Sequence, residues 1–233
     1  MVTHVGSKII GTPTLGLRDL VLWLKFDEGS GTTTNDSSLC NNRGVINGAT
    51  WTTGKFGYCL DFSGDYVEVA DSSSLDISIG TFAMFVYPTS SHLYGMAVLS
   101  KDEAFALSLR KPSGATQQYL DLFLHVGGSW VSGGSAMGVE TYNWHLIAAT
   151  FDGSQAKLYI DGELKNTKDV SGYIDKSTAN LWVGNNNASE LTKLTSFSGH
   201  IDEVRIYNRV LSDEEIKLLY YNRIGAVLSK SIS

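Results

Sequence analysis

The chain has 233 residues, of which 42% are hydrophobic and 18% are charged, a composition typical of a globular protein and not of a disordered one. Its formal net charge is −6 and no Lys/Arg cluster occurs, which argues against nucleic acid as the main partner. No apolar run approaches the roughly 18 residues that a membrane helix needs, which argues against membrane insertion.

The N-terminal segment, residues 1–16, shows no hydrophobic period and contains three glycines and one proline. We interpret it as an extended arm, followed by one domain over residues 17–223 and a second tail over residues 224–233. The arm lacks the continuous apolar stretch of a secretory signal. A signal was therefore removed before this numbering begins, or the protein leaves the cell by another route, such as inside a virus particle.

Short apolar or alternating segments with glycine turns between them follow along the chain. The pairs Asp152-Gly153 and Asp161-Gly162 separate apolar runs, which is the strongest local signal for hairpins. The 24 glycines against 3 prolines also favour strands over long helices. Together these features predict an all-β, antiparallel sandwich. The clearest expected strands are 20–26, 66–70, 82–88, 96–100, 105–110, 119–126, 144–151, 157–160, 181–184 and 199–207.

The last expected strand poses a question about charge. Strict alternation would place Asp202 on the same face as Val204 and Ile206, and so toward the core. A buried carboxylate needs a partner, which would be a cation, an Arg or Lys side chain, or several backbone N–H groups. After this strand, Ser212 and Glu215 have the spacing of a capping box, which predicts a short helix through Leu219.

This C-terminal stretch also resembles a known family. It is similar to the closing strand of the laminin-G-like, concanavalin A-like lectin/glucanase jelly-roll modules, and reads Gly199-His200-Ile201-Asp202-Glu203-Val204-Arg205-Ile206-Tyr207-Asn208-Arg209. The resemblance extends over about residues 17–223, and further matches include Asp27-Glu28, Asn47-Gly48-Ala49-Thr50-Trp51 and Leu60-Asp61-Phe62. It implies a two-sheet jelly roll with one short C-terminal helix.

The resemblance further implies a structural Ca²⁺ that joins the first loop to the last strand. The matching positions are Asp27 and Asp202, with backbone carbonyls such as that of Gly31 completing the shell. Ca²⁺ takes 6–8 oxygen ligands, and a glycine-rich polar loop can supply them. The alternative is that Asp202 pairs with a basic side chain or caps backbone N–H groups.

The two cysteines, Cys40 and Cys59, leave two states open. A disulfide between them would close a loop of about 20 residues and contribute roughly 3 kcal/mol. The other possibility is two free, buried thiols.

Two groups of residues are candidates for ligand contacts. On the strand 119–126, Tyr119, Asp121 and His125 share the face opposite the leucines, although such a stripe is more often an ordinary outer face. Trp130 lies between two glycine pairs, where we expect an exposed loop residue that binds sugars together with His92 or Tyr94. A tryptophan packed on its own sheet is the alternative. We expect the remaining tryptophans, Trp23, Trp51, Trp144 and Trp182, to pack in the core.

These observations favour a non-catalytic recognition or adhesion module that binds a glycan or a surface protein outside the cell. Retaining glycosidases on related sandwiches carry two nearby carboxylates on one strand, and this sequence has no such strand. One alternative is a structural or decorating protein of a virion or cell-surface assembly, or a homo-oligomer, that uses residues 1–16 and 224–233. A polysaccharide-cleaving enzyme that uses Asp121 or His125 is the other.

Overall fold

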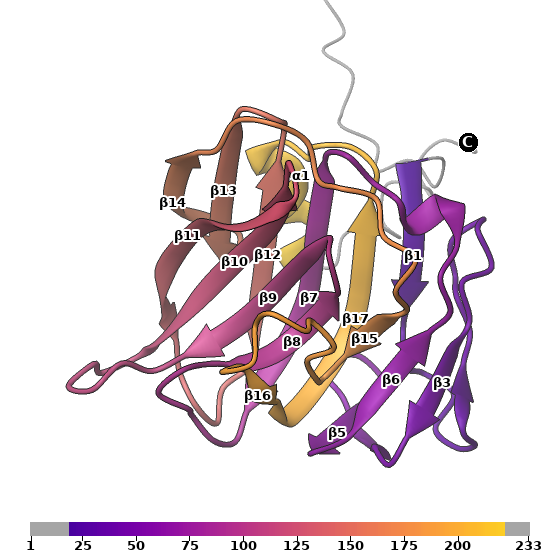
Figure 1. Cartoon of the computed structure of the whole chain (residues 1–233). Helices are drawn as coiled ribbons and strands as arrows, with labels where there is room; N and C mark the ends of the chain where they lie inside the picture. Colours follow the sequence, from indigo (N-terminus) through magenta and orange to yellow (C-terminus); the bar gives the residue numbers. More distant parts are fainter. Residues whose placement is uncertain (1–18, 222–233) are drawn as a thin grey trace, which may run out of the picture.

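The computed structural model describes residues 19–221, which form two packed β-sheets and one α-helix, with 51% of the chain in strands (Figure 1). The expected all-β jelly-roll sandwich with a short C-terminal helix is confirmed. The expected N-terminal arm, residues 1–16, and the C-terminal tail, residues 224–233, lie outside the described residues.

The first sheet, here called sheet A, has eight strands and is antiparallel. The closing strand β17 lies in its middle and pairs with β7, β5 and the first strand, β1. The order is β14 (Glu163–Asp169), β13 (Gln155–Ile160), β12 (His145–Phe151), β7 (Gly80–Pro88), β17 (Ser198–Tyr207), β5 (Tyr58–Ser63) and β4 (Thr50–Thr53), with β1 (Leu20–Leu24) against β17.

The second sheet, sheet B, has nine strands, and all of its pairs are antiparallel except that of β16 with β8. A short 3₁₀-helix, η2 (Ser73–Leu75), follows β6. The order is β11 (Ser129–Val139), β10 (Gln118–Val126), β9 (Phe105–Arg110), β8 (Met96–Lys101), β15 (Leu181–Val183), β6 (Tyr66–Val69), β3 (Gly44–Asn47) and β2 (Thr33–Thr34), with β16 (Thr195–Ser196) beside β8.

The main core lies between the two sheets. The even-numbered leucines of β10, Leu120, Leu122 and Leu124, are fully buried in it, as their alternation predicted. Phe82 of sheet A meets Phe105 of sheet B, with ring centroids 4.4 Å apart. Because the leucines face inward, the other face of β10 is the outer surface of sheet B.

A second, smaller core lies on the outer side of sheet A under helix α1 (Asp213–Tyr220). Ile216 and Leu219 of the helix are buried in this cluster with residues of β7 and β17. The predicted capping box is present, since Ser212 accepts from the N–H of Glu215 and the Glu215 carboxylate accepts from the N–H of Ser212. The helix is thus fixed at its first turn and covers one end of the sheet.

The face assignment made for β17 from strict alternation is wrong. Glu203 has a positive φ of 58° and the register with β7 shifts between Asp202 and Arg205, which is a β-bulge. The bulge puts Ile201 on the core side together with Val204 and Ile206. Asp202 therefore faces the outer side of sheet A, opposite Phe85, yet it is fully buried.

The two cysteines are free thiols, so the alternative with a disulfide does not hold in this structure. Cys40 is exposed in the loop after β2, so it is not the buried thiol that the other alternative assumed. Cys59 is buried on β5, where its Sγ lies 3.4 Å from the carbonyl oxygen of Thr53.

The four tryptophans expected in the core are all half-buried. Trp51 packs against the main core, and Trp23 and Trp144 pack against the smaller one. Trp182 differs from the expectation, because it pairs with Glu68 on the outer side of sheet B and stacks on Tyr66 with centroids 4.2 Å apart.

Candidate functional site

The outer face of β9, β10 and β11 carries most of the residues that the sequence marked as ligand candidates. Tyr119, Asp121, Phe123 and His125 follow one another along this face of β10. The chain between β15 and β16, orange in Figure 1, crosses in front of this sheet and is tied to β8 through Ser100, whose hydroxyl donates to the Asn185 carbonyl. Sheet and crossing segment together enclose a cleft.

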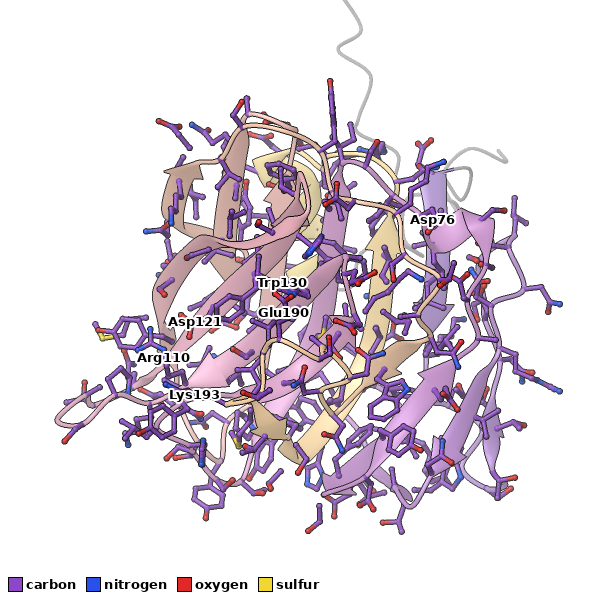
Figure 2. The ribbon with its side chains drawn as sticks, viewed as in Figure 1. Asp76, Arg110, Asp121, Trp130, Glu190 and Lys193 are labelled. Carbon is purple, nitrogen blue, oxygen red and sulfur yellow. The ribbon has the colours of Figure 1, made fainter. Side chains whose placement is uncertain are left out.

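An ion pair forms the polar floor beside this cleft. Arg110 of β9 donates from Nε and Nη2 to the two carboxylate oxygens of Asp121, at 2.7 and 3.1 Å. The Ser135 hydroxyl of β11 donates to the same carboxylate. The hydrogen bond with Asp121 raises the pKa of the Arg110 guanidinium, so Arg110 stays charged near neutral pH. Figure 2 shows Arg110 and Asp121 on this face.

The cleft beside the ion pair has a volume of about 310 Å³ and is mainly apolar. Phe123 and Arg110 contribute its sheet side, and Tyr94 comes from the loop before β8. The crossing segment supplies its other wall with residues 190–194. Aromatic and aliphatic walls with a few fixed polar groups are the usual construction of a site for a small ligand.

The charges around the cleft balance. Arg110 is neutralised by Asp121, and its guanidinium also lies 5.4 Å from the Tyr119 ring. On the rim, Lys193 lies 5.5 Å over the ring of Tyr94, and the same segment carries Glu190. A cleft with two basic and two acidic groups has no net charge to attract an ionic ligand, so it suits a neutral one.

His125 and Trp130 lie next to each other, one step beyond Phe123 along the outer face of β10, and neither of them lines the cleft. Trp130 is the second residue of β11 and pairs with His125, with ring centroids 5.3 Å apart. The expectation of an exposed loop tryptophan is thus wrong, because Gly127 and Gly128 form a tight hairpin and Trp130 is half-buried.

This end of β10 is held by local contacts. His125 Nδ1 lies 2.9 Å from Asp175, whose carboxylate also accepts the N–H groups of Gly127 and Gly128. The N–H of Gly128 is the main cause that lowers the pKa of Asp175, and His125 adds to it. The indole N–H of Trp130 is buried and has no partner among residues 19–221.

The structure therefore divides the six predicted residues. Tyr94 lines the cleft. Tyr119 and Asp121 do not line it, but both contact Arg110, which does. His92 supports Tyr94, because its Nδ1 accepts from the Tyr94 N–H at 3.3 Å. The sequence did not point to Arg110, Ser135 or the segment 190–194. The one local signal was Arg110 itself, a basic residue at the end of the apolar strand β9.

The proposed calcium ligands lie around the turn of residues 54–58. Asp202 Oδ2 accepts from the N–H of Phe56 at 3.0 Å, and Asp27 accepts from the N–H of Tyr58 at 3.2 Å. Gly54 is needed here, since a Cβ on it would lie 2.4 Å from the Tyr58 carbonyl oxygen and 2.8 Å from Asp202 Oδ2. Of the partners considered for the buried Asp202 carboxylate, the structure therefore shows a backbone N–H group.

Asp202 is incompletely compensated by that turn. Its Oδ1 is buried and finds no hydrogen-bond partner in the described part of the chain. Burial raises the pKa of Asp202 to about 7; the N–H of Phe56 opposes this, and the charges of Glu203 and Asp27 add to it. A cation between Asp27 and Asp202 would meet two carboxylates, one with an unused oxygen.

The rest of a calcium shell would have to come from carbonyls and water. Over residues 19–221 no group of three or more His, Cys, Asp or Glu side chains is placed to hold a metal ion. The Gly31 carbonyl already accepts from the Trp51 indole N–H at 2.9 Å, though a carbonyl oxygen has a second lone pair. The carboxylates of Asp27 and Asp202 therefore fit a hard cation. The remaining oxygen ligands would be carbonyl groups of the first loop and water.

A larger and more polar cleft of about 480 Å³ lies between β14, the end of β11 and helix α1. Its walls include Asp161, Glu163, Lys165 and Lys217. None of the residues predicted from the sequence lines it, and its aromatic contribution comes from the end of the helix.

The fold and the cleft define a jelly-roll module of the lectin and glucanase type. Residues 61–217 match the family model Laminin_G_3, described as the concanavalin A-like lectin/glucanases superfamily, and the chain belongs to this family. No curated protein matches the sequence. Within the described residues, no helix is long and apolar enough to cross a membrane.

Solved structures similar to this chain include a domain of an arabinanase and binding domains of toxins. One is domain 4 of AbnA, a GH43 extracellular arabinanase from Geobacillus stearothermophilus, in complex with arabinotriose. It is 20% identical to this chain, with a TM-score of 0.69, and the match covers 87% of this chain and 98% of that one. The binding domain of botulinum neurotoxin DC is 14% identical both in complex with rat synaptotagmin II (TM-score 0.63) and with SialylT (0.64). This chain spans about half of those toxin domains, 52% and 51%, and each match covers 88% of this chain.

Proposed function

We propose that the chain is a non-catalytic recognition module that binds an uncharged glycan in the cleft between Tyr94, Phe123 and the segment 190–194. The observation that carries this proposal is the Arg110–Asp121 pair, fixed beside an apolar cleft with aromatic walls. Sugars stack their C–H faces on aromatic rings while fixed polar groups orient their hydroxyls. Two of the similar structures are complexes with glycans, arabinotriose and SialylT, which supports a glycan, and a third is a complex with a protein, rat synaptotagmin II.

The polar groups of the cleft are suited to holding a ligand rather than to cleaving it. A retaining glycosidase needs one free carboxylate as nucleophile and a second that can give up a proton, about 5 Å apart. Asp121 is only 3% exposed and is bonded by Arg110 and Ser135, so it has neither role available. Glu190 is an exposed rim residue on the crossing segment.

We further propose a structural Ca²⁺ between Asp27 and Asp202. The ion would pair the unused Oδ1 of Asp202 and would hold the first loop against the closing strand. When bound, Ca²⁺ supplies positive charge and oxygen coordination, with no part in ligand chemistry. A calcium-stabilised glycan-binding domain of this kind is suited to work outside the cell, where we place it.

A glycan panel tests the ligand class. We expect the purified chain to bind at least one uncharged oligosaccharide, with arabinotriose as the first to measure, and to bind sialylated glycans more weakly. The cleft has no net charge, so raising the salt concentration should change the affinity little. Binding to a surface protein with no binding to any glycan would contradict the proposal.

A further inference from the structure

A row of four polar and aromatic side chains crosses the outer face of sheet A, on the opposite side of the sandwich from the cleft. Asp61 of β5 pairs with His200 of β17, and His200 pairs with Tyr87 of β7. Trp144 immediately precedes β12, whose first residue pairs with Val86 next to Tyr87. Three neighbouring strands, and the residue just before a fourth, therefore contribute one side chain each to the same line.

The side chains of this row contact one another. The rings of Tyr87 and His200 are nearly parallel, at 17°, with centroids 5.2 Å apart. Trp144 leans over both, 5.6 Å from Tyr87 and 6.2 Å from His200. Asp61 completes the row, with Oδ1 3.1 Å from His200 Nδ1. The result is an aromatic cluster bordered by a carboxylate.

Among residues 19–221, no element covers this row, while the neighbouring parts of the same face are covered. Helix α1 packs over the end of sheet A that carries Ala83 and Tyr207. The turn 54–58 covers the middle, where Phe56 meets Phe85 with centroids 5.2 Å apart. The four residues of the row all stay half-exposed, and the Asp61 side chain keeps 44% of its surface in water.

We infer that this row, Trp144, Tyr87, His200 and Asp61, is a second ligand-binding surface that takes an uncharged sugar ring with adjacent hydroxyl groups. The tilted indole offers an apolar face for the C–H side of the ring, and the Asp61 carboxylate can accept from two neighbouring hydroxyls. His200 Nδ1 is buried and faces Asp61, so the imidazole atom left to meet a sugar hydroxyl is Nε2. An apolar partner would bury the Asp61 carboxylate without hydrogen bonds, which is costly.

The inference goes beyond the proposed function, because it concerns different residues on the other sheet. With both surfaces active, one module would hold two glycan chains at once or two parts of one chain. Such bivalent attachment raises overall avidity without any new contact at either site.

Fluorine NMR of the full chain labelled with 5-fluorotryptophan tests the inference. The five tryptophans give five signals, and Trp144→Phe assigns the one that matters. The probes are the methyl glycosides of glucose, galactose, mannose and xylose. We expect at least one of them to shift the Trp144 signal in a saturable way. Asp61→Asn and His200→Gln should each weaken this binding about tenfold, and Asp169→Asn, on the exposed edge strand β14, should not change it.

The two sugar surfaces are separated by Tyr94→Ala, which should leave the Trp144 response intact. If sugars bind in the Tyr94 cleft while the Trp144 signal stays fixed, the second surface is refuted and the proposed function stands. A Trp144 response to choline or to lysine methyl ester but to no glycoside would also overturn it, because the row would then bind cations. So would a glycoside response that Asp61→Asn and His200→Gln leave unchanged in folded protein.

Discussion

Arg110 and Asp121, on neighbouring strands β9 and β10, form a two-pronged ion pair in which Nε and Nη2 each donate to one carboxylate oxygen. The two residues are not directly opposite in the register, since Asp121 pairs with Ser108 and Arg110 pairs with Tyr119. Arg110 thus reaches diagonally along the face and fixes the aromatic ring of Tyr119 as well as the carboxylate. This geometry orders the floor of the cleft before any ligand arrives.

Removing Arg110 should destabilise the fold through Asp121. In Arg110→Gln the carboxylate, only 3% exposed, keeps Ser135 but loses its counter-charge. We expect a loss of about 2 kcal/mol, below the ~3–5 kcal/mol of a fully buried pair, because the Arg110 side chain is 31% exposed. Urea unfolding measures it.

The double variant Arg110→Gln/Asp121→Asn is the control. It removes both charges together and should recover most of the lost stability. Two single variants whose effects simply add would show that the pair is not coupled.

Much of this face was predictable from local pattern. The alternation of β10 placed the leucines inward and Tyr119, Asp121 and His125 outward, and the structure has them so. The ion pair was not predictable, because nothing in the sequence gives the register of β9 against β10. The wall formed by residues 190–194 depends on where a loop crosses a sheet, and that is decided by tertiary contacts.

Two edge strands and one bulge escaped prediction for physical reasons. β14 is exposed along nearly its whole length, so it carries no hydrophobic alternation. β11 is interrupted by Gly133 and Gly134 at a register shift, which made it look like a loop and Trp130 like a loop residue. Glu203 adopts a positive φ although it is not a glycine, and no pattern in the sequence predicts this. The resulting bulge places Asp202 on the face opposite to the one predicted.

Calcium should stabilise the chain, and chelator should reverse the effect. At a hundredfold excess over Kd the expected gain is about 2.7 kcal/mol, several degrees in Tm. Because burial raises the pKa of Asp202 to about 7, protons compete with the metal, and the gain should be larger at pH 8 than at pH 5. Thermal melts of the wild type and of Asp202→Asn check this.

Asp65→Asn, a change in the turn between β5 and β6, is the matched control for the calcium melts. It should keep the response to calcium, and Asp202→Asn should lose it. A wild-type Tm that is equal in calcium and in chelator at pH 8 would remove the metal from the proposal.

The capping box of α1 predicts part of the acid sensitivity. Burial alone would raise the pKa of Glu215, but hydrogen bonds from Arg209 and from the N–H of Ser212 outweigh it and lower the pKa. A folded pKa below the unfolded value of about 4.3 means that this stabilisation is present above that pH and is lost as the pH falls through the folded pKa.

Glu215→Gln should therefore lower the Tm at pH 7 and flatten its decline toward pH 3. The exposed neighbour Glu214 is the control, and Glu214→Gln should follow the wild-type curve. Equal slopes for all three proteins would show that the Glu215 contacts add nothing to the pH dependence.

The two thiols should differ sharply in reactivity. Cys40 is exposed, and Cys59 is buried where desolvation, with the charges of Asp202 and Asp61, raises its pKa to about 12. We expect a thiol reagent to modify one cysteine per folded chain and two after unfolding. No reactive thiol before or after unfolding would indicate the disulfide that the structure lacks.

The most direct test of the glycan cleft is calorimetric titration of the chain with the best neutral oligosaccharide from the panel, comparing wild type, Tyr94→Ala and Tyr173→Ala. Both tyrosines are well exposed, at 55% and 66%, so neither substitution should disturb folding, and only Tyr94 lines the cleft. We predict that Tyr94→Ala weakens binding at least tenfold and that Tyr173→Ala does not change it. Equal affinity in all three proteins, or no glycan binding by the wild type, would contradict glycan recognition in this cleft.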